Sequence, residues 1–297
     1  MSEGAPAHLW RFDLDPERRA LARAEAVALG ARHEVAPGLY LEPSPCPAGR
    51  AAYGVGGGEL LGAGQPDALG GLLPAGSQVH VLRAPWKVAG NPLELLARIP
   101  GGYRIGPRKC GRVLYATEAG WYLVREAQPT GYESPTLPHR TSTSTSSQLA
   151  RAVVNLVARP GERLLDPLCG SGVILVEGAR IGCAVSGSDQ NAKLVWWARR
   201  NLRAVGLSGE VEEADAFARE PAGHDALVAD LPYGRRLEPA DLAPYASALP
   251  RLARRWALIV HHDLRPALEV AGHPPRLTLE VPKPTFVRYV HVGGEAL

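Results

Sequence analysis

The sequence lacks the features that would place it in several special classes of protein. Its four cysteines show no CxxC pairing and no histidine at metal-ligand spacing, so neither a zinc site nor a disulfide framework is indicated. The opening stretch MSEGAPAHLW has neither the basic nor the apolar segment of a signal peptide, and no apolar run reaches membrane-spanning length. We therefore expect a cytoplasmic protein with no metal site and no membrane partner.

A strong charge imbalance is also missing. The net charge is only +3, and 29 of the 33 basic residues are arginine, so charge alone does not announce a nucleic-acid partner. Hydrophobic residues make up 45% of the chain and charged residues 21%, which is typical of a folded protein. A chain of 297 residues suits two domains. We place them at residues 1–138 and 139–297; nothing in the sequence indicates an oligomeric state.

The first domain is expected to be a small α+β domain that opens with a strand, a helix and a strand. Residues 36–76 hold 17 glycines and prolines, which predicts a turn-rich connection or a loosely ordered insert. Residues 98–112 carry five basic side chains around Tyr103 and no acid, a pattern that suits either a phosphate backbone or a solvated arginine-rich loop. The candidate substrate-binding residues of this region are Arg104, Arg108 and Lys109.

Seven consecutive hydroxyl residues, Thr141 to Ser147, open the second domain. Composition alone fits a flexible linker, but the position before a nucleotide-type strand favours a place near a ligand. Ser146 or Ser147 is a natural N-cap for the helix that follows. From residue 162 onward strands and helices alternate, which predicts an α/β Rossmann-like domain with a mostly parallel seven-stranded sheet.

The segment DPLCGSG, residues 166–172, closes the first strand of this domain with a glycine turn of the nucleotide-binding type. Leu175 stands where a dinucleotide-binding fingerprint would carry its third glycine, which argues against a nicotinamide cofactor. The next two strands end in GSD and EAD, so three successive strands end in an acid. This series suits S-adenosyl-L-methionine, with one acid near its amino-acid end, one on the ribose and one on the adenine. The expected cofactor-binding residues are Asp166, Cys169, Gly170, Gly172, Asp189, Gln190, Asp215 and Ala216.

The fourth strand ends in VADLPYG and so delivers its last residues to the same edge of the sheet. Methyl transfer to an exocyclic amine requires the nitrogen lone pair to point at the methyl carbon. Asp230 and the backbone carbonyl of Leu231 can accept the two hydrogens of the amine. Pro232 fixes the turn, and Tyr233 can stack on the nucleic-acid base that carries the amine. A base within a nucleic-acid helix would have to be flipped out to reach this turn. These four residues are the candidate catalytic residues, and Arg235 and Arg236 are further substrate-binding candidates or simple solvated charge.

The combination of DPLCGSG and DLPYG resembles the amino-methyltransferases that carry a D/N-P-P-Y/F motif. The longer run from HRTSTS to GSD, followed by Asn201 and Leu202 and then by DLPYGRR, looks like the THUMP-domain tRNA guanosine N2-methyltransferases over about residues 139–297. The resemblance implies transfer of a methyl group from S-adenosyl-L-methionine to a guanine amine in tRNA. It also implies a tRNA-binding N-terminal domain, although no distinctive THUMP signature is present. The DLPYG spelling looks closest to members that act on the acceptor stem.

Other functions remain compatible with the same residues. Leu231 replaces the first proline of the motif, but it keeps the backbone carbonyl that the chemistry needs. The turn would present adenine equally well, so an adenine-N6 methyltransferase acting on DNA or ribosomal RNA is the alternative within the enzyme class. Methylation of a protein glutamine uses the same turn, but the basic region 98–112 makes it less attractive. A non-catalytic RNA-binding protein on a methyltransferase scaffold is the alternative from another class.

Overall fold

The computed structural model of the chain consists of two compact units. The N-terminal unit consists of Met1–Asp15 and Leu29–Gly131, and the C-terminal unit consists of Pro16–Ala28 and Tyr132–Leu297. The structure describes residues 8–47, 50–83, 86, 88–107, 110–126, 132–141, 144–219, 223–232, 239–283 and 286–296. Within these ranges, no helix has both the length and the apolar character needed to span a membrane.

The N-terminal unit is built on an eight-stranded sheet with the order β2-β3-β1-β4-β8-β7-β5-β6. Most neighbours run antiparallel, but β5 pairs parallel with both β6 and β7. Its helical elements include η1 (Pro66–Leu69) and α2 (Pro92–Ala97), the latter opened by a capping box between Asn91 and Glu94. The strands are β1 (His8–Phe12), β2 (Glu34–Ala36), β3 (Leu39–Glu42), β4 (Gly54–Gly64), β5 (Gln78–Leu82), β6 (Arg104–Ile105), β7 (Arg112–Ala116) and β8 (Trp121–Glu126).

The glycine-rich stretch of this unit is a strand rather than a loose insert. The sequence-based expectation for residues 36–76 is therefore wrong, because β4 runs through eleven of them and pairs with both β1 and β8. The physical reason is visible at Gly57, whose φ is 155°. A Cβ atom at this position would lie 2.4 Å from the carbonyl oxygen of Leu9 on β1. Glycine here allows two strand backbones to approach more closely than any side chain would permit.

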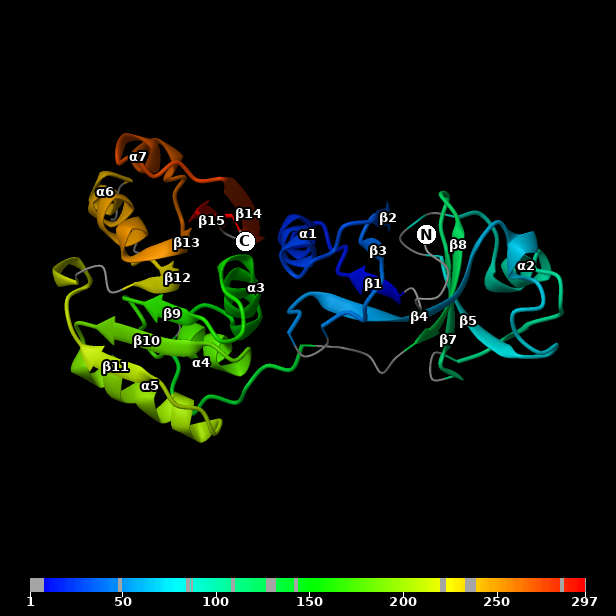
Figure 1. Cartoon of the computed structure of the whole chain (residues 1–297), viewed down its shortest axis with the longest axis horizontal. Helices are drawn as coiled ribbons and strands as arrows, with labels where there is room; N and C mark the ends of the chain where they lie inside the picture. Colours follow the sequence, from blue (N-terminus) through cyan, green and yellow to red (C-terminus); the bar gives the residue numbers. More distant parts are fainter. Residues whose placement is uncertain are drawn as a thin grey trace. The chain divides into compact units, whose positions relative to one another are not determined.

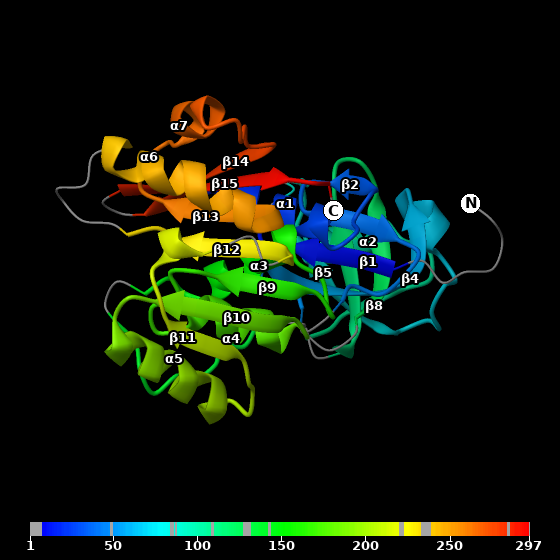
Figure 2. The same ribbon diagram turned by 60° about the vertical axis from the view of Figure 1, so that its left-hand side comes forward.

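The C-terminal unit contains the predicted seven-stranded sheet, with the order β11-β10-β9-β12-β13-β15-β14 (Figures 1 and 2). The first five strands in this order, β11, β10, β9, β12 and β13, run parallel to one another. Strand β15 runs antiparallel to both of its neighbours, β13 and β14. The predicted α/β class with a mostly parallel sheet is confirmed. The strands are β9 (Arg163–Asp166), β10 (Ala184–Asp189), β11 (Glu210–Glu213), β12 (His224–Asp230), β13 (Ala253–Val260), β14 (Leu277–Lys283) and β15 (Phe286–Gly294).

Helices cover both faces of this sheet. One face is covered by α3, α4 and α5, and the other is packed by α6, η4 and α7 around a core that includes Leu227, Leu231 and Leu258. The side chain of Ser146 accepts a hydrogen bond from the Leu149 amide at 3.3 Å and so caps α3, as the sequence suggested. The helices are α3 (Ser147–Val157), α4 (Val173–Arg180), α5 (Ala192–Ala204), η3 (Ala216–Ala218), α6 (Pro239–Ala248), η4 (Leu249–Leu252) and α7 (Arg265–Val270).

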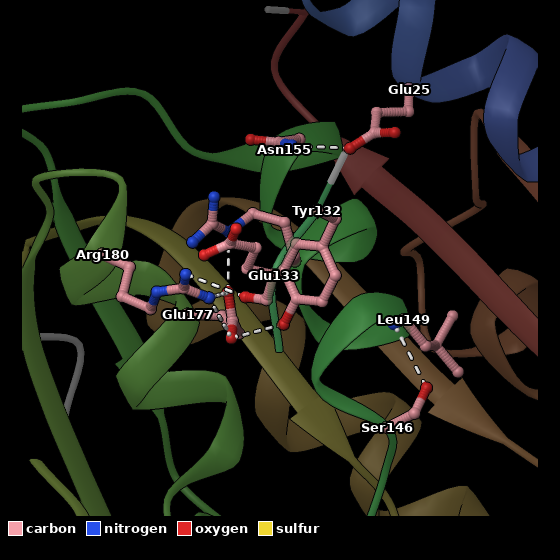
Figure 3. A network of polar contacts seen from close by, with 9 residues as sticks. Glu25, Tyr132, Glu133, Ser146, Leu149, Asn155, Glu177 and Arg180 are labelled. Atoms are coloured by element: carbon pink, nitrogen blue, oxygen red, sulfur yellow. Dashed lines mark hydrogen bonds and ion pairs between the residues drawn. The ribbon is translucent and has the colours of Figure 1, made fainter. Parts of the chain in front are cut away.

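The first helix of the chain, α1 (Arg19–Ala28), belongs to the C-terminal unit and not to a β-α-β opening of the N-terminal one. It contacts α3 and β14. Its buried side carries Leu21 and Glu25, and the side-chain amide of Asn155 on α3 donates a hydrogen bond of 2.7 Å to Glu25 (Figure 3). A buried carboxylate is tolerated in such a place because it is hydrogen-bonded.

Candidate functional site

The candidate site lies at the carboxyl edge of the parallel strands. Strands β10 and β12 flank β9 on opposite sides, so the strand order reverses between β9 and β12. Ligands of open α/β sheets bind outside the carboxyl ends of the strands at such a switch point. Asp166, Asp189 and Asp230 are the last residues of β9, β10 and β12, so the sheet brings three of the predicted acids to this one edge.

A tight turn joins β9 to α4 at this edge. Gly170 and Gly172 both have positive φ, 52° and 80°, a conformation that favours glycine. A Cβ atom on Gly172 would lie 2.8 Å from the Cβ atom of Ala198 on α5, whereas one on Gly170 would meet nothing within 4 Å. Gly172 thus serves close packing between helices, and Gly170 leaves open space at the turn. The amide of Gly170 donates to Asp189 at 3.0 Å and ties the turn to the end of β10.

A pocket of about 310 Å³ occupies this edge, a volume at the low end of the range for small-molecule sites. Its lining comes from the ends of β9, β10 and β12, from the glycine turn, from the starts of α4 and α5, and from the hydroxyl-rich segment before α3. Seven of the predicted site residues are among them. The lining residues are Thr141, Ser144, Thr145, Asp166, Leu168, Cys169, Gly170, Ser171, Val173, Ile174, Asp189, Leu194, Asp230, Leu231 and Pro232.

Two carboxyl groups of the pocket are held away from water. Burial raises the pKa of Asp166 well above its ordinary value, and the charges of Asp230 and Asp189 raise it further, although the Leu168 amide donates to Asp166 at 3.2 Å and opposes the shift. Burial raises the pKa of Asp230 to about 7. Oδ1 of Asp230 is buried and has no hydrogen-bond partner among the residues that the structure describes. A buried acceptor without a partner in a pocket is an acceptor available to a ligand.

A charged residue that the sequence reasoning missed faces Asp230. The positive charge of Arg288 on β15 lowers the pKa of Asp230 against the effect of burial. Arg288 is itself buried, and its Nη1 atom donates a hydrogen bond of 2.8 Å to the hydroxyl of Thr145. Phe286, on the same strand as Arg288, stacks on the ring of His261 just after β13, with centroids 4.3 Å apart. The only sequence signal for Arg288 was an arginine inside the apolar strand pattern FVRYVHV.

The segment before α3 is anchored by a buried ion-pair network (Figure 3). Glu177 on α4 accepts a hydrogen bond of 2.7 Å from the hydroxyl of Tyr132, and pairs with Arg151 at 2.8 Å and with Arg180 at 3.1 Å. Glu177 and Arg151 are almost fully buried, so each compensates the other. Nη2 of Arg180 donates to the backbone carbonyl of Glu133 at 2.9 Å. The network fixes Tyr132 and Glu133, at the start of this segment, on α3 and α4.

Asn201 on α5 fixes the middle of the same segment. Its side-chain oxygen accepts from the His139 amide at 3.0 Å, and its side-chain nitrogen donates to the carbonyls of His139 and Ser171 at 2.7 and 2.8 Å. The hydroxyl of Ser144 lies 3.2 Å from that of Ser171 in the glycine turn. Among the described residues of the hydroxyl run, Thr141, Ser144 and Thr145 thus reach the pocket, so the run is part of the site rather than a linker.

Several predicted site residues lie elsewhere. Gly172 packs on α5, Gln190 and Asp215 are exposed, and the Asp215 side chain accepts the Phe217 amide at 2.9 Å as the cap of η3. None of them, nor the buried Ala216, is among the residues that line the pocket. Arg104 is exposed on β6 in the N-terminal unit. Arg108, Lys109, Tyr233, Arg235 and Arg236 lie outside the described residues.

Tyr103, at the centre of the basic region, is buried rather than available to a nucleic acid. Its hydroxyl donates to the carbonyl of Leu69 at 2.9 Å and accepts from the Leu73 amide at 3.0 Å. The ring of Tyr103 is therefore not available to stack on a base, and the basic side chains of residues 98–112 are left to either of the two interpretations. The polar tip of this side chain is satisfied inside the core, which is the usual arrangement for a buried tyrosine.

Comparison with known protein families finds a match over the segment that carries the site. Residues 138–257 match the RMKL-like methyltransferase domain. A tRNA (guanine(10)-N2)-dimethyltransferase from Methanothermobacter thermautotrophicus is 43% identical over 94 residues, 31% of this chain and 28% of the relative. A ribosomal RNA small subunit methyltransferase C from Chromohalobacter salexigens is 28% identical over 188 residues, 52% of this chain and 56% of the relative. The matches thus cover between about a quarter and a little over half of these relatives' lengths.

Comparison with solved structures extends the likeness of fold over both units. The crystal structure of TrmN from Thermus thermophilus superposes with a TM-score of 0.53 at 20% identity, covering 97% of this chain and 99% of the other. At this identity the likeness concerns the fold alone. The family match covers the glycine turn and the three acids at the switch point. Over residues 138–257, the segment that carries these residues, the chain is therefore similar to the RMKL-like methyltransferase domain.

Proposed function

We propose that this protein is a tRNA methyltransferase that transfers a methyl group from S-adenosyl-L-methionine to the exocyclic N2 amine of a guanosine. The observation that carries the proposal is the buried Oδ1 of Asp230 in the pocket at the switch point, which has no hydrogen-bond partner within the described part of the chain. The curated relative with 43% identity is a tRNA guanine-N2 dimethyltransferase, which supports this substrate class. We further propose the cytoplasm as the compartment and tRNA binding as the role of the N-terminal unit, which carries exposed Arg104.

The pocket has the chemistry that S-adenosyl-L-methionine requires. Asp166, Gly170 and Asp189 all line the pocket. Asp189 at the end of β10 would accept the ribose hydroxyls, and Asp166 and Gly170 would lie beside the amino-acid end. The open space beside Gly170 lets a ligand approach the backbone. The bound cofactor would supply an electrophilic methyl group. We assign Cys169 to the wall of the pocket, because burial raises the pKa of its thiol far above the ordinary value and so disfavours the nucleophilic thiolate.

Asp230 is the residue that orients the substrate amine. An ionised carboxylate only accepts hydrogen bonds, so Asp230 can draw one N–H bond of the guanine amine toward Oδ1 and turn the nitrogen lone pair away from the ring. The carbonyl of Leu231 would take the second hydrogen, and the fully buried Leu231 side chain anchors the turn in the core. With a pKa of about 7, Asp230 can also hold the proton that the nitrogen releases after methylation.

The direct test uses labelled S-adenosyl-L-methionine and a full set of unmodified tRNA transcripts, followed by nucleoside analysis. We expect label in N2-methylguanosine. Asp230→Ala should abolish turnover while leaving cofactor affinity, measured by calorimetry, nearly unchanged, because this side chain contacts the amine. Asp189→Ala is the matched variant, and it should weaken cofactor binding first. A large loss of cofactor affinity in Asp230→Ala would contradict the assigned role.

The other outcomes separate the remaining functions. Label in N6-methyladenosine, on DNA or ribosomal RNA, would replace guanine N2 by adenine N6 as the target, since the same turn presents either amine. The absence of cofactor binding by the wild-type protein would favour a non-catalytic RNA-binding role. No N2-methylguanosine in any tRNA, with the cofactor bound, would refute the proposal.

A further inference from the structure

Helix α5 presents two cation–ring pairs to solvent, each with i,i+4 spacing. The guanidinium of Arg200 lies 4.9 Å from the ring centroid of Trp196, and the ammonium of Lys193 lies 5.0 Å from that of Trp197. Residues three or four apart are neighbours on the surface of a helix. The members of each pair are four apart and the two pairs are offset by three, so both pairs share one surface. The proposed function uses none of these four residues.

The ring of His139 joins the two pairs. It stacks on Trp197 with an interplanar angle of 8° and centroids 5.5 Å apart, and it lies 5.1 Å from Trp196 at a tilted angle. Asn201 holds the His139 backbone in place from the same helix. We call this surface the α5 face: Lys193, Trp196, Trp197, Arg200 and His139.

The α5 face is solvent-accessible although it carries large apolar rings. Trp196 is 48% exposed, and Lys193 and Arg200 are exposed. An exposed tryptophan needs an explanation in a chain that buries most of its aromatic rings. Stacking on the rings restricts the two cationic side chains before any ligand arrives, so less rotamer freedom is lost when they bind one.

Two residues of the α5 face, Lys193 and His139, are close in sequence to residues that line the pocket. Leu194 lines the pocket and follows Lys193 directly, and Thr141 lines it two residues after His139. A substrate with its reacting group in the pocket therefore has this surface next to its flanking part.

The charge of α5 selects the kind of partner. Its thirteen residues include four basic side chains and no acidic one. Cores of protein–protein interfaces are depleted of lysine, whereas a basic surface interleaved with aromatic rings suits phosphates and unstacked bases. Resting on the proposed function, we infer that the α5 face binds the RNA strand flanking the target nucleotide: Lys193 and Arg200 contact phosphates, and Trp196 stacks on a base.

The test measures binding of unmodified tRNA transcripts by fluorescence anisotropy at several salt concentrations, so it does not depend on methylation. Lys193→Ala/Arg200→Ala should reduce the slope of log K against log salt by roughly 1.4 to 1.8, the value for two lost phosphate contacts. The matched control is Arg251→Ala/Arg254→Ala, which removes two exposed charges near the start of β13, the opposite end of the strands. The control should lower the slope by less than half as much.

A second pair of variants tests the stacking. Trp196→Ala should weaken tRNA binding roughly fivefold or more, and Trp196→Phe, which keeps a ring, should recover most of the loss. Cofactor affinity should stay unchanged in both, which excludes misfolding as the cause. An unchanged salt slope and unchanged affinity in these variants would overturn the inference, as would wild-type protein that binds no tRNA. The expected losses without any N2-methylguanosine from the wild type would support the α5 face and refute the proposed reaction.

Discussion

Asp166 and Asp230 end neighbouring strands, and the pocket keeps both carboxyl groups from water. Their pKa values are raised mainly by burial, and Asp166 is raised further by the charges around it. Groups with strongly shifted pKa values gather at functional sites because the same desolvation that costs stability prepares a side chain for chemistry. Asp230 is balanced between its two forms near neutral pH, with Arg288 favouring the ionised one.

This balance predicts the pH dependence of the reaction. In the proposed reaction the ionised carboxylate of Asp230 is the stronger acceptor and can take up the proton that the amine releases. Burial raises the pKa of Asp230 to about 7, so kcat/KM should increase as the pH rises through about 7. Arg288 lowers that pKa, and Arg288→Met should therefore move the midpoint to higher pH. Thr145→Val is the control, because it removes the hydrogen bond to Arg288 but keeps the charge. A pH profile that does not move in Arg288→Met would show that Asp230 does not set the acidic limb.

At the scale of elements, the turn between β9 and α4 contains two glycines with different duties. Both have positive φ, but only Gly172 lacks room for a side chain, because α5 lies against it. The turn is thus held by packing at Gly172 and left open at Gly170, which lines the pocket.

Two alanine variants separate these duties. Gly172→Ala should destabilise the C-terminal unit by about 1 to 3 kcal/mol, since it adds a clash with Ala198 to the unfavourable φ. Gly170→Ala carries the φ penalty alone and should cost less stability. Calorimetric melting of both variants measures the difference. Equal melting temperatures would mean that α5 moves aside without cost.

The elements that a local pattern specifies were predictable from the sequence. Alternating strands and helices gave the sheet of the C-terminal unit, and the strand-end acids Asp166, Asp189 and Asp230 do meet at one edge. Arg288 was not predictable, because its position beside Asp230 depends on how β15 inserts antiparallel next to β13. Asp215 follows the edge strand β11, too far from the switch point to line the pocket.

At the scale of the whole molecule, sequence order and unit membership do not coincide. The chain starts in the N-terminal unit, continues through α1 in the C-terminal unit, and then returns to the N-terminal unit. After residue 131 it belongs to the C-terminal unit again. Composition predicted a loose insert where β4 lies, because glycine is normally depleted in strands. In β4 glycine is favoured instead, because β4 lies so close to β1 that a Cβ atom at Gly57 would clash. This close approach is visible only in the pairing of the two strands.

The placement of α1 predicts that a fragment of residues 132–297 is incomplete. It would lack the buried Leu21 and leave the Asn155 amide of α3 without Glu25, a loss of about 2 kcal/mol or more. Amides of α3 should then exchange with deuterium roughly an order of magnitude faster in the fragment than in the full chain. Val27→Ala in the full chain is the control, because Val27 is exposed on the same helix. Equal exchange of α3 in fragment and full chain would show that α1 contributes nothing.

The position of α1 early in the sequence has a consequence for folding during synthesis. It leaves the ribosome with its apolar side uncovered, and its partner α3 is made about 120 residues later. At translation rates of roughly 5 to 20 residues per second, this interval lasts about 6 to 24 s, ample time for the helix to meet other apolar surfaces. The C-terminal unit can therefore be completed only after the strands of the N-terminal unit have been synthesised, which makes the nascent chain a natural client for chaperones.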